Sequence, residues 1–175
     1  MTIDFMRWGA RAVTLVRATV LAAILMIGCS ATSNAEDPAR SGQQQRNADV
    51  VREAFALGVG GADSFYSILA EDVQWTVARA VEPRTYTSRA QFLQEGAGPI
   101  TTRLNGPIQA HVRELITEDD VVVAIWDGTA TALDGRPYVN SYAWVMTMRN
   151  EQVVRVTAYL DLVALNELLE RVAPA

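Results

Sequence analysis

The sequence predicts an α+β domain in which helices come first and an antiparallel sheet follows. Helical spacing of apolar residues dominates residues 47–104, and four long strand-like runs fill residues 108–160. The connectors between those runs are only three or four residues long. Such connectors are too short for a parallel crossover, so each run must pair with the next in an antiparallel meander.

Composition limits the chemistry of the chain. Its 175 residues suit one ordinary domain with a short appendage, half of them are hydrophobic, and the net charge is −5. The chain has no lysine, which excludes Schiff-base chemistry and phosphate-loop motifs, and a single histidine and a single cysteine, which exclude zinc sites built from these residues. We therefore expect no metal, no cofactor and no nucleic-acid partner.

Residues 1–28 are predicted to be a signal peptide. Three arginines precede an uncharged run over residues 18–28, which is too short to span a bilayer. The run ends at Gly28-Cys29 and resembles a bacterial lipoprotein signal, which predicts export to the cell envelope and a lipid anchor on Cys29. The small-x-small string that ends at Ala35 leaves plain secretion open, as does the possibility that Cys29 is simply a buried residue.

Residues 29–46 are rich in Ser, Ala, Gln and Asn and are predicted to form a flexible tether. The folded domain should cover residues 47–172. A first helix begins near Asn47 and ends at the glycines from Gly58 onward. Asp63 is predicted to cap a second short helix, and residues 73–77 form a strand around Trp75.

A capping box then predicts a helix that begins at Arg89. Ser88 and Gln91 have the spacing in which each can bond to the backbone of the other, and Gly96, Gly98 and Pro99 are expected to end the helix. A turn or short helix should cover residues 100–104. The four strands are predicted at residues 108–117, 121–133, 138–148 and 153–160, and a last helix at residues 162–171. Long strands beside few helices favour a strongly curved sheet wrapped on the helices, with a hollow between them.

Several strings in this order resemble the nuclear transport factor 2-like superfamily and, within it, the SnoaL-like branch. They are Asp72-Val73-Gln74-Trp75, Tyr86-Thr87-Ser88-Arg89 with Phe92, Tyr138-Val139-Asn140-Ser141-Tyr142, and Tyr159-Leu160-Asp161. The resemblance covers residues 47–172 and implies a cone-shaped fold with an apolar pocket. Members of the superfamily include isomerases, cyclases, epoxide hydrolases, dehydratases and non-catalytic binding or assembly modules, so the fold does not determine the reaction.

The strand over residues 138–148 indicates where a pocket would lie. One of its faces is large and aromatic and carries a single amide, Asn140, which is typical of a ligand cavity. A plain aromatic core or a dimer interface would show the same pattern. We expect the following residues to form the walls: Trp75, Tyr86, Phe92, Trp126, Tyr142 and Trp144.

Asp161 is the candidate acid/base, because the SnoaL-like resemblance places such an aspartate at the matching Tyr-x-Asp position. A carboxylate in an apolar hollow has its pKa raised by desolvation. Asp161 shares one side of its strand with Tyr159, and Tyr159 and Asn140 would orient a substrate. His111 is a further acid/base candidate. Asp161 also directly precedes the last helix and can cap it, and a single His is more often a surface residue.

Two functions remain open at this point. The first is a cofactor-independent isomerase, cyclase or hydratase that acts on a hydrophobic small molecule. The second is a non-catalytic, lipid-anchored envelope module that binds a ligand or a partner chain. Glu82 and Arg84 are candidates for the pocket rim. A homodimer through the outer sheet face is expected from a row of small apolar residues there: Val139, Ala143, Val145, Val154, Val156 and Ala158.

Overall fold

The computed structural model describes residues 38–175. The predicted signal peptide, the lipidation site at Cys29 and the first part of the tether lie outside the described residues. Within residues 38–175, no helix has the length and apolar character needed to cross a membrane.

The sheet has six strands in the order β2-β1-β6-β5-β4-β3. The last four in the chain form the predicted antiparallel meander, while β1 pairs parallel to β6 and antiparallel to β2. Register shifts between β3 and β4, and between β5 and β6, are typical of bulges that bend a sheet. The strands are β1 (Leu69–Val77), β2 (Arg84–Tyr86), β3 (Gln109–Glu118), β4 (Val121–Thr131), β5 (Pro137–Arg149) and β6 (Gln152–Leu160).

The first helix, α1, runs over Pro38–Ala56 and is longer than predicted. Residues 38–46, assigned from the sequence to the flexible tether, are helical, so that part of the tether prediction is wrong. Amide side chains one turn apart explain the difference: Gln43 donates to Asn47 and Gln45 donates to Asp49, both at 2.9 Å. The apolar end of the helix carries Phe55 into the core.

The second helical region is longer and more continuous than predicted. After the short η1 (Phe65–Ile68), which Ser64 caps instead of Asp63, the chain forms α2 (Arg89–Gln91), the π-helix η2 (Phe92–Ala97) and α3 (Gly98–Thr101). The Ser88 half of the capping box is confirmed, because the Ser88 hydroxyl accepts from the backbone N–H of Gln91 at 3.1 Å. The other half differs, because the Gln91 side-chain oxygen accepts from the N–H of Thr87 at 3.0 Å instead of that of Ser88. The glycines and the proline do not stop the helix; Pro99 lies in the first turn of α3, where its missing N–H has no consequence.

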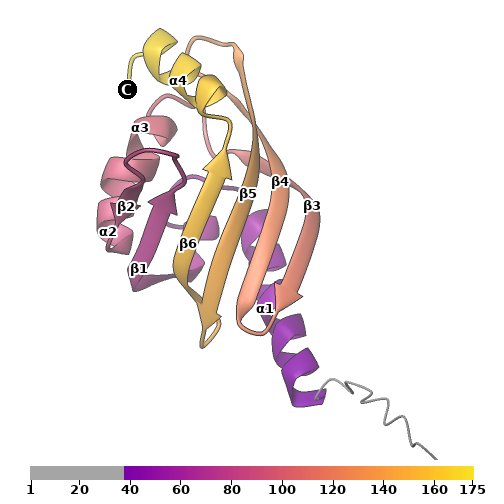
Figure 1. Cartoon of the computed structure of the whole chain (residues 1–175). Coiled ribbons are helices and arrows are strands. Elements are labelled where there is room, and N and C mark those ends of the chain that lie inside the picture. Colours follow the sequence, from indigo (N-terminus) through magenta and orange to yellow (C-terminus); the bar gives the residue numbers. More distant parts are fainter. Residues whose placement is uncertain (1–37) are drawn as a thin grey trace, which may run out of the picture. The chain divides into compact units, whose positions relative to one another are not determined.

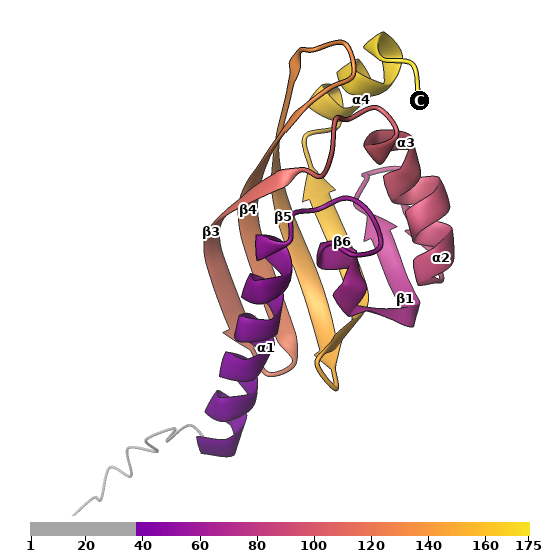
Figure 2. The same cartoon turned by 180° about the vertical axis from the view of Figure 1, so that it is seen from behind.

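Side-chain alternation separates the two faces of the sheet. Every second residue of β5 from Tyr138 to Met148 is buried on the inner face. Figure 2 shows this face, with α1 across β3 and β4 and the α2–α3 segment beside β1. The opposite face, seen in Figure 1, is covered by no helix of the described part of the chain.

The faces of β6 are the reverse of the expected ones. Val156 and Ala158 are buried on the inner face, and Tyr159 is 52% exposed on the outer face. The register explains this, because Ala158 lies opposite Trp144 while Tyr159 lies opposite Ala143. Tyr159 therefore does not share the pocket face of β5, and Val156 and Ala158 do not belong to the outer apolar row.

The last helix, α4 (Leu162–Arg171), has the predicted bounds. It lies at the end of the sheet where β6 finishes, next to the connection between β4 and β5 (Figure 1). Three of its leucines, Leu162, Leu165 and Leu169, face a cavity on the inner side of the sheet.

Candidate ligand-binding pocket

A pocket of about 240 Å³ lies between the inner face of the sheet, the η2–α3 segment and α4. Its lining is mostly apolar and aromatic, as is typical of sites for small hydrophobic molecules. All six residues predicted to form its walls do line it: Trp75, Tyr86, Phe92, Trp126, Tyr142 and Trp144. The aromatic face read from the sequence is therefore the wall of a cavity as well as part of the core.

The wall is built from two stacked aromatic pairs. Trp75 stacks on Phe92 and Trp126 stacks on Tyr142, each with ring centroids 4.0 Å apart. Trp144 lies edge-on to both tryptophans, at 4.9 Å from Trp75 and 4.8 Å from Trp126. These are favoured geometries for aromatic contacts, so the flat walls are held in place before any ligand binds.

Two glycines make this packing possible. A Cβ on Gly128 would lie 2.7 Å from Ile108 and 3.0 Å from both Trp126 and Tyr142. A Cβ on Gly96 would lie 2.7 Å from the Phe92 ring. Any side chain at either position would push an aromatic ring out of the wall.

Tyrosine hydroxyls supply the polar groups inside the pocket. The Tyr142 hydroxyl is hydrogen-bonded to that of Tyr138 at 3.1 Å, while the Tyr66 hydroxyl makes no hydrogen bond within residues 38–175. Burial raises the pKa of Tyr66 and of Tyr142, and neighbouring tyrosines add to both shifts. Both groups therefore stay protonated and neutral, and each can donate a hydrogen bond to an acceptor on a ligand.

Asn140 and Asp161 form a hydrogen-bonded joint between β5 and the start of α4, and their polar groups are used in this joint instead of facing a ligand. The buried Asn140 amide donates to the Tyr138 hydroxyl at 3.0 Å and to the backbone carbonyl of Asp161 at 2.9 Å. Its own oxygen accepts from the Asp161 N–H at 3.0 Å. The Asp161 carboxylate accepts from the amides of Val163 and Ala164 and so caps α4. The expected position of Asp161 inside the apolar hollow is wrong, because its carboxylate is exposed and bonds to the helix end.

The other two candidate catalytic residues also lie away from the pocket. His111 is exposed on β3 opposite Asp127, and Tyr159 is exposed on the outer face of β6. Asp127 pairs instead with Arg113 at 3.2 Å across the strands. The structure thus brings the predicted wall residues together but does not bring the four predicted catalytic residues to one site.

Charged side chains occur only at the mouth of the pocket. Of the residues that line it, Arg79, Arg84 and Glu95 are charged, and all three are exposed. Arg84 pairs with Glu95 at 3.2 Å and lies over the Tyr86 ring, 5.0 Å from its centroid. The rim prediction holds for Arg84, whereas Glu82 does not line the pocket.

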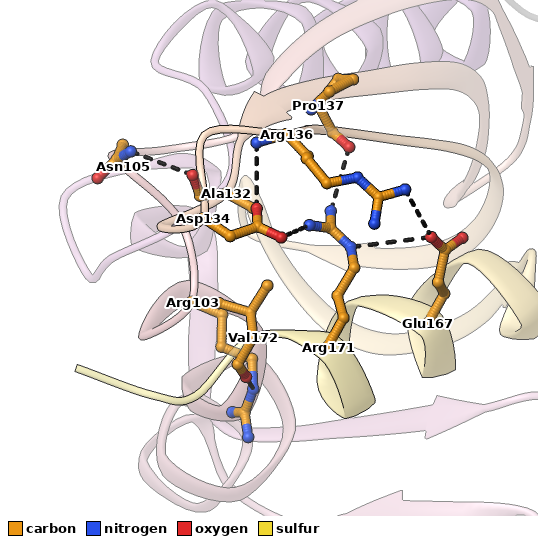
Figure 3. Close-up of polar contacts among 9 residues, drawn as sticks. All are labelled: Arg103, Asn105, Ala132, Asp134, Arg136, Pro137, Glu167, Arg171 and Val172. Carbon is orange, nitrogen blue, oxygen red and sulfur yellow. Dashed lines mark hydrogen bonds and ion pairs between the residues drawn. The ribbon is translucent and has the colours of Figure 1, made fainter.

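One end of the pocket wall is secured by a polar cluster of Arg171, Asp134, Arg136 and Glu167 (Figure 3). Arg171 on α4 pairs with Asp134, and it also donates to the Pro137 carbonyl at 3.2 Å. Arg136 pairs with Glu167 at 3.4 Å. The cluster attaches the C-terminal end of α4 to the loop between β4 and β5. The Asn140–Asp161 joint holds the N-terminal end of the same helix.

Sequence reasoning missed several members of the site. Tyr66 lies in a four-residue helix with no periodicity, and Arg79 lies in a loop, so neither carried a pattern. The leucines of α4 belong to a correctly predicted helix, but they were not predicted to line a pocket. Within residues 38–175 there is also no cluster of three His, Cys, Asp or Glu side chains that would suit a metal ion.

Comparison with solved structures identifies the same architecture in other proteins. TerC, crystallised with polyporic acid, is 23% identical with a TM-score of 0.56, and the match covers 71% of this chain and 98% of that one. A candidate SnoaL-like polyketide cyclase from Jannaschia sp. CCS1 is 16% identical with a TM-score of 0.60, covering 78% of this chain and 98% of that one. An NTF2-like protein of unknown function from Burkholderia pseudomallei K96243 is 19% identical with a TM-score of 0.55, covering 71% and 97%. At these identities the likeness establishes the fold alone.

The family model named SnoaL-like domain matches residues 37–156. No curated protein matches the sequence. The chain belongs to the SnoaL-like domain family, as the sequence strings predicted.

The polar cluster leads to a prediction about stability and pH. The hydrogen bond from Arg171 holds the pKa of Asp134 below its usual value, with smaller help from Arg136. A lowered folded pKa means that the cluster stabilises the protein above the unfolded pKa of about 3.9 and that this stabilisation is lost as the pH falls through the folded value. Asp134→Asn should therefore lower Tm at pH 7, and the difference from the wild type should shrink as the pH falls below about 3.9.

Thermal unfolding of the two proteins between pH 2.5 and 7 measures this difference. Asp72→Asn is a matched control, because Asp72 forms only an exposed pair with Arg149 at 3.7 Å. The control should leave Tm nearly unchanged at every pH. A Tm difference for Asp134→Asn that is as large at pH 2.5 as at pH 7 would contradict the prediction.

Proposed function

We propose that this SnoaL-like protein binds a flat, hydrophobic small molecule between its aromatic walls. The observation that carries the proposal is the pocket itself: two stacked aromatic pairs and an edge-on tryptophan line an apolar space large enough for a fused-ring compound. Flat rings bind well against flat walls, because both stacking and burial of apolar surface contribute. The Tyr66 hydroxyl, which has no protein partner in the described residues, is free to donate to a ligand oxygen.

The family and its neighbours support this class of ligand. SnoaL-like proteins bind small hydrophobic molecules, and TerC was crystallised with polyporic acid. The contacts of Asp161 favour binding over the catalytic alternative, in which that residue is the acid/base. Its carboxylate is engaged by two amides of α4, and Glu95 is the one carboxylate among the pocket-lining residues, where it pairs with Arg84.

Filling the pocket should weaken binding. Leu165 lies on the pocket side of α4, so Leu165→Trp should lower the affinity for a planar apolar compound about tenfold or more, a loss of about 1.4 kcal/mol. Val163→Trp is the matched control, because Val163 is 79% exposed on the same helix. Asp161→Asn, which keeps the cap but removes the carboxylate, should also leave binding unchanged.

Isothermal titration with a small set of fused-ring compounds measures these affinities. Native mass spectrometry of protein from its own cells would identify a ligand that is retained through purification. If Leu165→Trp binds with unchanged affinity, the ligand does not bind in this pocket. If Asp161→Asn greatly lowers the affinity, Asp161 takes part in ligand binding after all.

The outer face of the sheet supports a second proposal, that the protein is a homodimer. Val139, Ala143 and Val145 lie on this face of β5, with Tyr159 on the adjacent β6 and Ile116 on β3, beyond β4. Val139 is 56% exposed and Tyr159 is 52% exposed. Apolar surface of this kind, on a sheet face that no helix of residues 38–175 covers, favours association with a second copy.

Light scattering tests the dimer directly. The wild type should have twice the mass of the chain, and Val145→Arg should produce a monomer, because it places a charge at the centre of the apolar row. Val81→Arg, a substitution at an exposed loop residue away from the sheet, should stay dimeric. A monomeric wild type would refute the proposal.

The predicted signal peptide over residues 1–28 supports a third proposal, that the protein is exported and anchored through a lipid on Cys29. The support is sequence alone: three arginines, a short apolar run, and a small residue before the cysteine. Metabolic labelling with a fatty acid should mark the wild type and not Cys29→Ala, which should also leave the membrane fraction. Label that persists in Cys29→Ala would rule out this anchor.

A further inference from the structure

The mouth of the pocket differs from its interior in charge. Apart from the phenol and indole groups, Thr101 and Asn166, the uncharged lining is apolar, and the charged lining residues Arg79, Arg84 and Glu95 are all exposed. An ionised ligand group would be strongly disfavoured inside, because it would lose its water without gaining a charged partner. A ligand that carries a charge must therefore place it at the mouth.

The charge balance at the mouth is positive. Arg84 and Glu95 offset one another through their 3.2 Å pair, whereas Arg79 forms no ion pair with any residue in the described range. Both arginines lie close enough to Tyr86 to oppose the effect of its burial, which raises the pKa of that phenol. This local excess of positive charge occurs on a chain whose net charge is −5.

The pair between Arg84 and Glu95 does not prevent Arg84 from contributing. Both side chains are about half exposed, and ion pairs of this kind are weak, so a ligand anion can share the guanidinium. The position of Arg84 above the Tyr86 ring also keeps its planar group at the opening. Arg79 and Arg84 thus converge on the place where the outer end of a bound molecule would lie.

We infer that the ligand is a flat hydrophobic monoanion, such as an aromatic carboxylate, whose rings lie between the aromatic walls and whose charged group is bound at the mouth by Arg79 with help from Arg84. This inference rests on the proposed binding function and adds the charge and orientation of the ligand. It also assigns Arg79 as a residue that determines specificity.

A pair of isosteric probes separates the charge from the rings. Isothermal titration of the full-length protein with 2-naphthoate and with neutral 2-naphthamide compares the same ring system with and without the anion. The wild type should bind the carboxylate about tenfold more tightly. Arg79→Gln should weaken carboxylate binding about three- to tenfold, as expected for one partly exposed charge contact, and should leave amide binding unchanged.

Arg155→Gln is the matched control. Arg155 is exposed on the outer strand face of β6 and does not line the pocket, so its loss changes the net charge equally without touching the mouth. It should bind both probes as the wild type does. Raising the salt concentration should reduce the preference of the wild type for the carboxylate, because screening weakens exposed charge contacts.

The outcomes separate the inference of an anionic ligand from the proposed function of binding flat hydrophobic molecules. If both probes bind the wild type equally, or if Arg155→Gln weakens carboxylate binding as much as Arg79→Gln does, the anion inference is overturned and the binding function stands. If neither probe binds, both are overturned for this class of ligand. A preference for the carboxylate that is lost only in Arg79→Gln supports the inference.

Discussion

The alternation of side chains along β5 is the constraint on which the rest of this structure depends. Because Tyr142, Trp144 and Met146 all face inward, the sheet must bury a layer of large rings, and a layer that thick holds the helices away from the strands. The rings touch one another at stacked and edge-on angles. Space then remains where the rings meet smaller residues such as Ala158, and this space is the pocket.

The same alternation explains which predictions succeed. Runs with strict period two, and the Ser88 cap, are local signals that nothing in the tertiary structure opposes. The four strands of the meander, the start of α2 and the six wall residues therefore follow from the sequence, whereas the three-residue β2 was not predicted. The predicted helix at residues 162–171 succeeds for the same reason. Each of these features is specified by a short stretch of sequence, so it can be predicted without knowing which other elements pack against it.

The wrong predictions concern features that depend on strand pairing and tertiary contacts, which a short stretch of sequence does not specify. The sequence pattern predicts the side of β6 that carries Tyr159 to face the pocket, whereas the pairing of β6 with β5 turns Val156 and Ala158 inward. The apolar row was the better indicator of the buried face. Asp161 was placed in the hollow by resemblance, yet its carboxylate bonds to the end of α4. Tyr66 and Arg79 could not be predicted as site residues, because each lies in a segment without a repeating pattern and reaches the pocket only in the folded structure.

Three of the four tryptophans in the chain, Trp75, Trp126 and Trp144, lie in the pocket wall, and the fourth, Trp8, is outside the described residues. Their rings are within about 5 Å of one another through Trp144, at 4.9 and 4.8 Å. The near-ultraviolet absorption and emission of the folded domain are therefore dominated by one small region. A spectroscopist who excites the domain of residues 38–175 at the indole band observes the cavity almost alone, without having attached any dye.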